Sequence, residues 1–340
     1  MYWFLTYLIM INLIHGNLNF ILFIIFIFIF NFFLITYFLK TFKIKKLIDF
    51  PDEERKIHKQ PVQKIGGLII IINLIIFNFF QITPFFDLPL FVLIISIFLI
   101  GFFDDLFDLN PYLRIFLIII FLLLHLLYDE KLLLNKVYFE TFENYKNFEN
   151  FSFLFTIFCI VVLINAFNLF DGLNGLSLSY FLIIFIYLFI KYNQDLFIPL
   201  ICLCIILLYF NLKNKIFLGD SGVYILSIIL GVKIIEIHNN YEFQLSSENI
   251  FILLMLPGID MLRIFFERTI NRKMFLTPDK KHFHHYFLNK FGEIKTLLYL
   301  IIFLVVPIFV YEKNLLPTYM IIFLTISIYT SILIYFKKNE

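Results

Sequence analysis

Charged residues are scarce in this sequence: Lys, Arg, Asp and Glu together make up only 15% of its 340 residues. Hydrophobic residues make up 61%, and the mean hydropathy is +0.93. A chain with so little charge cannot cover a soluble globule with a polar surface. The composition therefore predicts an integral membrane protein that is surrounded by the lipid bilayer and has no nucleic-acid partner.

Cysteine is also rare, and no cysteine is placed for a metal site or a disulfide framework. Cys159, Cys202 and Cys204 all lie inside apolar runs, where a free thiol behaves as a small apolar side chain. The sequence likewise shows no linker, no soluble region and no convincing internal repeat. We therefore expect one membrane-embedded domain over residues 1–340.

Long continuous apolar runs dominate the chain. A helix needs roughly 20 apolar residues to cross a bilayer, whereas a closed barrel would show short alternating strands. The runs therefore predict an all-α polytopic protein with about eleven transmembrane helices, or ten by a stricter reading. They are Phe20–Leu39, Gly67–Ile82, Leu88–Phe103, Pro111–Leu127, Phe151–Phe167, Leu176–Ile190, Leu196–Phe210, Val223–Ile237, Ile250–Phe266, Leu297–Val310 and Leu316–Tyr335.

The placement of charge predicts the orientation. The loop of residues 40–64 is rich in lysine, and loops of this kind stay on the cytoplasmic side. If the helices alternate from there, every polar island discussed below faces the cytoplasm. The opposite side receives residues 128–150, where acids outnumber lysines, and residues 238–249, which contain neither Lys nor Arg. We therefore expect the active site on the cytoplasmic face.

Three carboxylates follow the apolar run Leu88–Phe103 directly: Asp104, Asp105 and Asp108. Ionised carboxylates are costly in hydrocarbon, so we expect this acidic triplet in water at the membrane edge, where it can hold a divalent cation. If Asp105 and Asp108 are helical, they share one face, and Asp104 reaches the same ion from a loop. The alternative is a solvated helix cap.

The first cytoplasmic loop combines Arg55, Lys56 and His58 with two prolines and the pair Gly66 and Gly67. Basic residues beside a membrane commonly fix the topology or contact anionic lipid, and this reading stays open here. The combination with prolines and glycines is less ordinary. It favours a shaped loop that contacts phosphate.

A second polar island covers residues 165–177. Asn165, Asn168 and Asp171 are spaced by three and would line one helix face. Gly172 and Gly175 then allow a tight turn with close backbone approach. Amides and a carboxylate in this arrangement suit a nucleotide or a sugar; a polar helix end with a glycine cap is the alternative.

The third island reads Phe-Leu-Gly-Asp-Ser-Gly over residues 217–222 and precedes the run from Val223. Glycines around an acid at a helix start form a nest that receives anions, while the Asp220 carboxylate can ligate a cation. The pattern suits a metal-bound diphosphate. On its own it is equally typical of a helix N-cap.

The last large cytoplasmic loop ends with three histidines, His282, His284 and His285, which follow two lysines. Such a cluster can bind zinc, contact phosphate or transfer protons. The Cys and His partners of a closed zinc site are missing, which favours phosphate contact or transfer chemistry. A passive basic surface is the remaining alternative.

Taken together, these motifs resemble the polyprenyl-phosphate N-acetylhexosamine-1-phosphate transferases, members of glycosyltransferase family 4. The resemblance runs from about Asp49 to His285 and covers all five motifs in family order. The Pro-Asp-Lys-Lys-His context of the final histidines is most similar to the WecA and TagO branch, and less to the related MraY.

The resemblance implies that a UDP-N-acetylhexosamine and undecaprenyl phosphate give a lipid diphospho-sugar and UMP, at the start of a cell-envelope glycan. It implies a bacterial inner-membrane location, a homodimer, and magnesium as cofactor, with manganese as the alternative, because phosphoryl transfer depends on positioning and charge neutralisation. A direct attack by the lipid phosphate and a covalent aspartyl intermediate both fit, and we favour direct attack.

The resemblance also assigns roles to residues of this sequence. The metal ligands would be Asp220, Asp104 and Asp105. The catalytic groups would be Asp104, Asp105, His282, His284 and His285. The substrate-binding groups would be Arg55, Lys56, His58, Asp108, Asn165, Asn168, Asp171 and Asn174.

Two positions depart from the family pattern. Many relatives carry a second Asp where this chain has Asn174, and Arg where it has Lys64. Lysine keeps the charge but loses the bidentate fork of arginine. The Asn174 position keeps open a relative that binds polyprenyl phosphate without catalysis. A separate rival is a secondary transporter, in which buried acids and broken helices would form the site; it would show repeated halves and a site near the membrane midplane.

Overall fold

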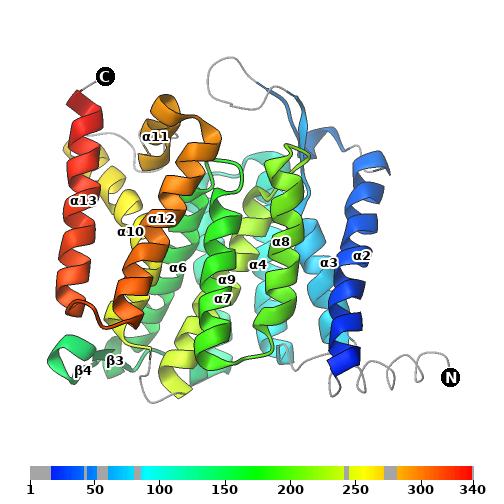
Figure 1. Cartoon of the computed structure of the whole chain (residues 1–340). Helices are drawn as coiled ribbons and strands as arrows, with labels where there is room; N and C mark the ends of the chain where they lie inside the picture. The colour runs from blue at the N-terminus through cyan, green and yellow to red at the C-terminus, as the bar shows by residue number, and fades with distance from the viewer. Residues whose placement is uncertain are drawn as a thin grey trace. The chain divides into compact units, whose positions relative to one another are not determined.

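A computed structural model describes residues 17–41, 44–51, 60–79, 86–240, 245–271 and 282–338. Each predicted apolar run coincides with one helix (Figure 1). The helices are α2 (Asn17–Thr41), α3 (Gly66–Phe79), α4 (Leu88–Phe107), α5 (Pro111–Tyr128), α6 (Ser152–Phe170), α7 (Leu176–Tyr192), α8 (Phe197–Leu212), α9 (Gly219–Asn240), α10 (Ser247–Ile270), α11 (Phe283–Phe291), α12 (Glu293–Glu312) and α13 (Thr318–Lys338).

Within the described ranges, eight helices are long and apolar enough to cross a membrane, and α3, α7 and α8 are apolar but shorter. The prediction of an all-α polytopic membrane protein is therefore confirmed. Several boundaries differ from the prediction by a few residues, and two of these differences affect the site. Helix α4 continues past Phe103 to Phe107, and α9 begins at Gly219 instead of Val223, so acids expected in loops lie within helical turns.

The chain divides into two compact units, and the divisions fall within α5, α7 and α9. Unit 1 comprises residues 1–121 and 181–226, and unit 2 comprises residues 122–180 and 227–340. In unit 1, α2 packs against α8, where the rings of Phe32 and Phe210 lie 5.8 Å apart. The buried amides of Asn31 and Asn73 exchange hydrogen bonds of 2.9 and 2.7 Å and join α2 to α3, since apolar lipid offers amides no partner.

A small three-stranded sheet completes unit 1. It contains β1 (Ile48–Asp49), β2 (Val62–Lys64) and β5 (Ile216–Phe217) in the order β1-β2-β5. Strand β2 pairs antiparallel with β1 and parallel with β5, with Lys64 opposite Phe217. Because Phe217 lies only two residues before Gly219, where α9 begins, this register brings Lys64 to the start of that helix.

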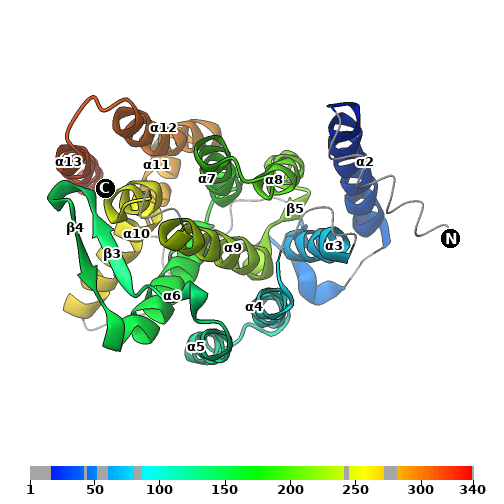
Figure 2. The same ribbon diagram turned by 90° about the horizontal axis from the view of Figure 1, so that it is seen from below.

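In unit 2, α10 packs against α6 and α12, and α11 contacts α12 and α13. A hairpin of β3 (Lys136–Phe139) and β4 (Asn144–Asn147) lies against α10 (Figure 2). The Glu248 carboxylate holds this hairpin by accepting the backbone N–H groups of Glu140 and Thr141, both at 3.0 Å. Helix α11 was not predicted, because its nine residues carry no apolar run.

Candidate active site

Close backbone packing places the first turn of α9 against α3 and α4 in unit 1. A Cβ added to Gly101 would lie 2.6 Å from the Cα of Ser221, and one added to Gly67 would lie 2.6 Å from the backbone nitrogen of Gly222. The Gly67 N–H also donates to the carbonyl of Leu218 at 3.1 Å. The glycine pair that begins α3 therefore serves close helix packing and does not lie in the loop where the sequence had placed it.

The Asp105 carboxylate fills the backbone nest at the start of α9. Its Oδ1 accepts the Asp220 N–H at 3.0 Å, and its Oδ2 accepts the Ser221 N–H at 3.0 Å and the Ser221 hydroxyl at 2.8 Å. A helix N-terminus favours an anion, and the predicted nest holds the Asp105 carboxylate. The sequence had suggested a diphosphate in this place.

Asp104 and Asp220 converge on one cation. The guanidinium Nη1 of Arg114 donates to Oδ2 of Asp104 and lies 3.5 Å from Oδ2 of Asp220. Asp104 is buried and also accepts the N–H of Leu109 at 2.8 Å, whereas the Asp220 side chain is 34% exposed. Asp220 is therefore the carboxylate of this acidic group that is open to a ligand.

Lys64 balances the acids from the end of β2. Its Nζ lies 3.7 Å from Oδ1 of Asp105. Burial lowers the pKa of Lys64, but the charges of Asp105 and Asp220 outweigh that effect, so the pKa is raised above its usual value. The ammonium group is therefore kept charged. A lysine ammonium makes a single contact of this kind, whereas an arginine guanidinium would offer a bidentate fork.

The acidic triplet is arranged differently from the prediction. Asp104 and Asp105 are only 3% and 4% exposed, so the expectation that they sit in water was wrong. Asp108 leaves the helix as its C-cap, with φ of 49°, and is exposed. Asp105 and Asp108 therefore do not share a helix face as predicted. The two helical acids are the adjacent Asp104 and Asp105; Asp104 pairs with Arg114, and Asp105 accepts hydrogen bonds from the start of α9.

The donor chemistry of this site suits magnesium. Among the described residues, no group of three or more His, Cys, Asp or Glu side chains is arranged around a common metal position. Magnesium, however, needs only one or two carboxylates when a substrate supplies phosphate oxygens. Asp220 offers one half-open oxygen donor, and Asp104, which pairs with Leu109 and Arg114 in this structure, is the second carboxylate beside it. The residues therefore fit the ion.

The island of residues 165–177 forms the end of α6 and the turn that follows in unit 2. Asn165 and Asn168 are helical and half-buried, and Asp171 is the C-cap of the helix. The Asn165 amide donates to the carbonyl of Val161 at 2.7 Å. Asn174 lies in the turn, and Gly175 has φ of 78°, which confirms the tight turn predicted from the glycines.

The histidines gather at the start of α11, also in unit 2. The ring centroids of His282 and His284 lie 5.5 Å apart and those of His284 and His285 4.2 Å apart. A Cβ added to Gly172 would lie 2.2 Å from Nε2 of His284, so this turn is built to accept the ring. The structure thus brings two predicted islands, the Asp171 turn and the histidines, together.

His284 is the most deeply buried of these rings, at 1% exposure. Neither of its ring nitrogens has a hydrogen-bond partner among the described residues. Burial, followed by repulsion from His285 and His282, lowers the pKa of His284 well below its usual value. The ring is therefore neutral at physiological pH.

Two site residues were missed from the sequence. Arg114 is the single charged residue of its apolar run, and Asp260 shares its run only with Arg263. Charged residues within apolar runs usually mark function, so this signal would have found both. Three predicted substrate-binding residues, Arg55, Lys56 and His58, lie outside the described residues.

Comparison with known proteins gives two matches. Residues 88–238 match the family model of glycosyl transferase family 4. An undecaprenyl-phosphate alpha-N-acetylglucosaminyl 1-phosphate transferase of Thermotoga maritima is 30% identical over 263 residues, which cover 77% of this chain and 79% of that protein. The chain belongs to glycosyl transferase family 4. In this family member, the matched segment contains the acids Asp104, Asp105 and Asp220 and the Arg114 that pairs with two of them.

Proposed function

We propose that this member of glycosyl transferase family 4 transfers N-acetylhexosamine-1-phosphate from a UDP-sugar to undecaprenyl phosphate, releasing UMP. GlcNAc is the sugar we favour, because the Thermotoga maritima relative is named for that sugar and that acceptor. The observation that carries the proposal is the half-open Asp220 carboxylate, held beside Asp104 by a shared Arg114. Such a group of fixed charges suits a diphosphate substrate.

In the proposed reaction, an oxygen of the lipid phosphate forms a bond to the phosphorus that carries the sugar. The bond from that phosphorus to the bridging oxygen breaks, and UMP leaves with the oxygen. Positioning and charge neutralisation supply most of the catalysis in phosphoryl transfer. A covalent intermediate on Asp105 is disfavoured, because both of its oxygens accept hydrogen bonds from α9 and its side chain is 0% exposed.

We propose magnesium as the cofactor, with manganese as the alternative. Asp220 and Asp104 would hold the ion, and the bound ion would neutralise charge on the diphosphate oxygens. Asp105 has a different role in this proposal: it fixes the first turn of α9 and thereby the position of Asp220. Lys64 and Arg114 offset the negative charge of the three acids.

Residues of unit 2 carry further predicted roles. His282, His284 and His285 would bind phosphate or take part in transfer, and Asn165, Asn168, Asp171 and Asn174 would bind the nucleotide sugar. Arg55, Lys56, His58 and Asp108 complete the predicted substrate-binding set. The approach of His284 to the Gly172 turn supports a shared role for the first two groups.

The protein is a multi-pass membrane protein, and we propose the bacterial inner membrane as its location, with the active site on the cytoplasmic face. The lysine-rich loop of residues 40–64 supports this orientation. The product would start a cell-envelope glycan. A homodimer remains part of the proposal through family membership.

Product analysis tests the function. Purified protein in detergent is given undecaprenyl phosphate, magnesium and either UDP-GlcNAc or UDP-GalNAc, and the lipid is analysed by mass spectrometry. We expect a lipid diphospho-N-acetylhexosamine from one donor, and none after divalent cations are chelated. Absence of product with both donors, while lipid binding persists, would favour a relative that only binds polyprenyl phosphate.

A further inference from the structure

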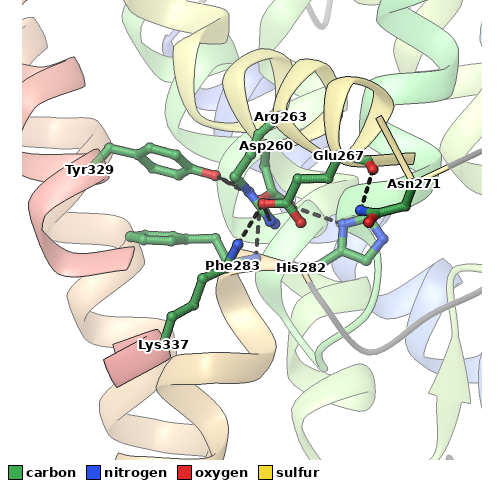
Figure 3. Close-up of polar contacts among 8 residues, drawn as sticks. All are labelled: Asp260, Arg263, Glu267, Asn271, His282, Phe283, Tyr329 and Lys337. Carbon is green, nitrogen blue, oxygen red and sulfur yellow. Dashed lines mark hydrogen bonds and ion pairs between the residues drawn. The ribbon is translucent and has the colours of Figure 1, made fainter. Parts of the chain in front are cut away.

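The buried carboxylate of Asp260, on α10, is the centre of a hydrogen-bond network in unit 2 (Figure 3). It is 2% exposed and accepts four hydrogen bonds. At Oδ1 the donors are Nη2 of Arg263 at 2.8 Å, the hydroxyl of Tyr329 at 2.8 Å and the N–H of Phe283 at 3.0 Å; at Oδ2 the donor is Nδ1 of His282 at 2.9 Å. Both oxygens of this carboxylate therefore accept hydrogen bonds from the protein.

These contacts determine which nitrogen of His282 carries the hydrogen. A guanidinium is always charged, so Arg263 keeps Asp260 ionised, and an ionised carboxylate can only accept. Tyr329 agrees with this direction, because its hydroxyl accepts from Nε of Arg263 at 2.9 Å and so must turn its own hydrogen to Asp260. Nδ1 of His282 must then be the donor.

We propose that Asp260 is a positioning residue that fixes the Nδ1-protonated form and the ring orientation of His282. Nε2 is then the ring nitrogen left to exchange a hydrogen bond or a proton with a substrate. An aspartate that orients a histidine in this way sets which nitrogen performs acid–base chemistry. The catalytic part of this inference rests on the proposed function.

The same network reaches the C-terminal helix. Arg263 also donates to Oε1 of Glu267 at 3.0 Å, and Lys337 of α13 lies 2.6 Å from that same oxygen. Tyr329 is likewise on α13, so this helix supports Asp260 although it lies outside the recognised motifs. The ring of His282 also stacks on that of His284, with the two planes 9° apart. A rotation of the His282 ring would therefore disturb its contact with His284.

The substitution Asp260→Asn changes the tautomer of His282 while it keeps the shape of the side chain at position 260. Three donors converge at Oδ1, so the amide oxygen will take that position and the amide NH₂ will face Nδ1 of His282. Two donors cannot pair, so His282 must accept at Nδ1 and carry its hydrogen on Nε2. The variant therefore reverses the tautomer with almost no change in volume.

Nitrogen-15 NMR of protein labelled at the histidine rings measures the tautomer directly. The His282 signals are assigned by their loss in His282→Gln. We expect the Nδ1-protonated pattern in the wild type and the Nε2-protonated pattern in Asp260→Asn. Glu267→Gln is the matched control, since Glu267 belongs to the network but does not contact His282, and it should keep the wild-type pattern.

Kinetics then test the link to catalysis. For Asp260→Asn we expect kcat for UMP release to fall by about 10²-fold or more, the scale of general acid–base catalysis, with little change in KM. An Nε2-protonated ring in the wild type would overturn the positioning claim, whether or not the variant folds. A reversed tautomer with undiminished kcat would overturn its catalytic part. If the wild type itself does not turn over, the proposed function fails, and NMR alone decides the role of Asp260.

Discussion

Ser221 donates two hydrogen bonds to one carboxylate oxygen of Asp105, from its backbone N–H at 3.0 Å and from its hydroxyl at 2.8 Å. The contact joins α4 to the first turn of α9, where Asp220 lies. The position of the open carboxylate therefore depends on a buried one. A variant that weakens this contact should affect both stability and activity.

Asp105→Asn tests that dependence. The amide presents a donor to the N–H groups of α9, and a buried donor left without an acceptor costs about 1–3 kcal/mol. We expect a lower melting temperature in detergent, measured by thermal unfolding, together with reduced UMP release. Asp108→Asn is the control for stability, because Asp108 is exposed and asparagine tolerates its left-handed backbone. Equal stability of the two variants would contradict the role given to Asp105.

Gly101→Ala tests the close packing of α4 on α9. The added methyl group would lie 2.6 Å from Cα and 2.7 Å from the backbone nitrogen of Ser221, so backbone must move. We expect destabilisation by about 1–3 kcal/mol, as for an overpacked core, and loss of transferase activity. Gly258→Ala on α10 is the matched control, since nothing lies within 4 Å of its added Cβ. A Gly101→Ala protein with wild-type activity would show that α9 need not stay at this distance.

His284 makes stability depend on pH. The lowered pKa means that the folded protein keeps the ring neutral, whereas the unfolded chain takes up a proton near pH 6.5. Stability is therefore full above about pH 6.5 and falls as the pH drops below it, by up to about 1.4 kcal/mol per pH unit.

Melting temperatures at pH 8.5, 7.5 and 5.5 measure this effect in the wild type and in His284→Leu. Between pH 8.5 and 7.5 the ring is neutral in both states, so the two proteins should keep a constant difference. Between pH 7.5 and 5.5 the wild type should lose more stability than the variant. Parallel curves over the whole range would refute a neutral buried ring.

The helices could be predicted from the sequence because each span carries its own signal, a continuous apolar run. The identity of the polar islands could be predicted too, since Asp220 and the histidines stand out among apolar neighbours. Their contacts could not. Asp105 binds Ser221 at a sequence separation of 116 residues, and no local pattern encodes such a pairing.

The burial of Asp104 and Asp105 could not be predicted from the local sequence. Asp104 and Asp105 were placed in water because isolated carboxylates are costly in a membrane, but Arg114 and the α9 backbone satisfy them inside the protein. Asp260 was overlooked although it is one of only two charged residues in its run. Apart from Arg263 on the same helix, its partners are His282 and Phe283 at the start of α11 and Tyr329 on α13, which the sequence does not connect to it.

UMP release with undecaprenyl phosphate and a UDP-amino sugar tests the central claim most directly. The wild type and the exposed-acid control Asp195→Asn should release UMP only when the lipid is present. Asp220→Asn should be slower by about 10²-fold or more, the scale of losing one electrostatic contact to the transition state. No release from any UDP-amino sugar, or an undiminished rate in Asp220→Asn, would contradict the account.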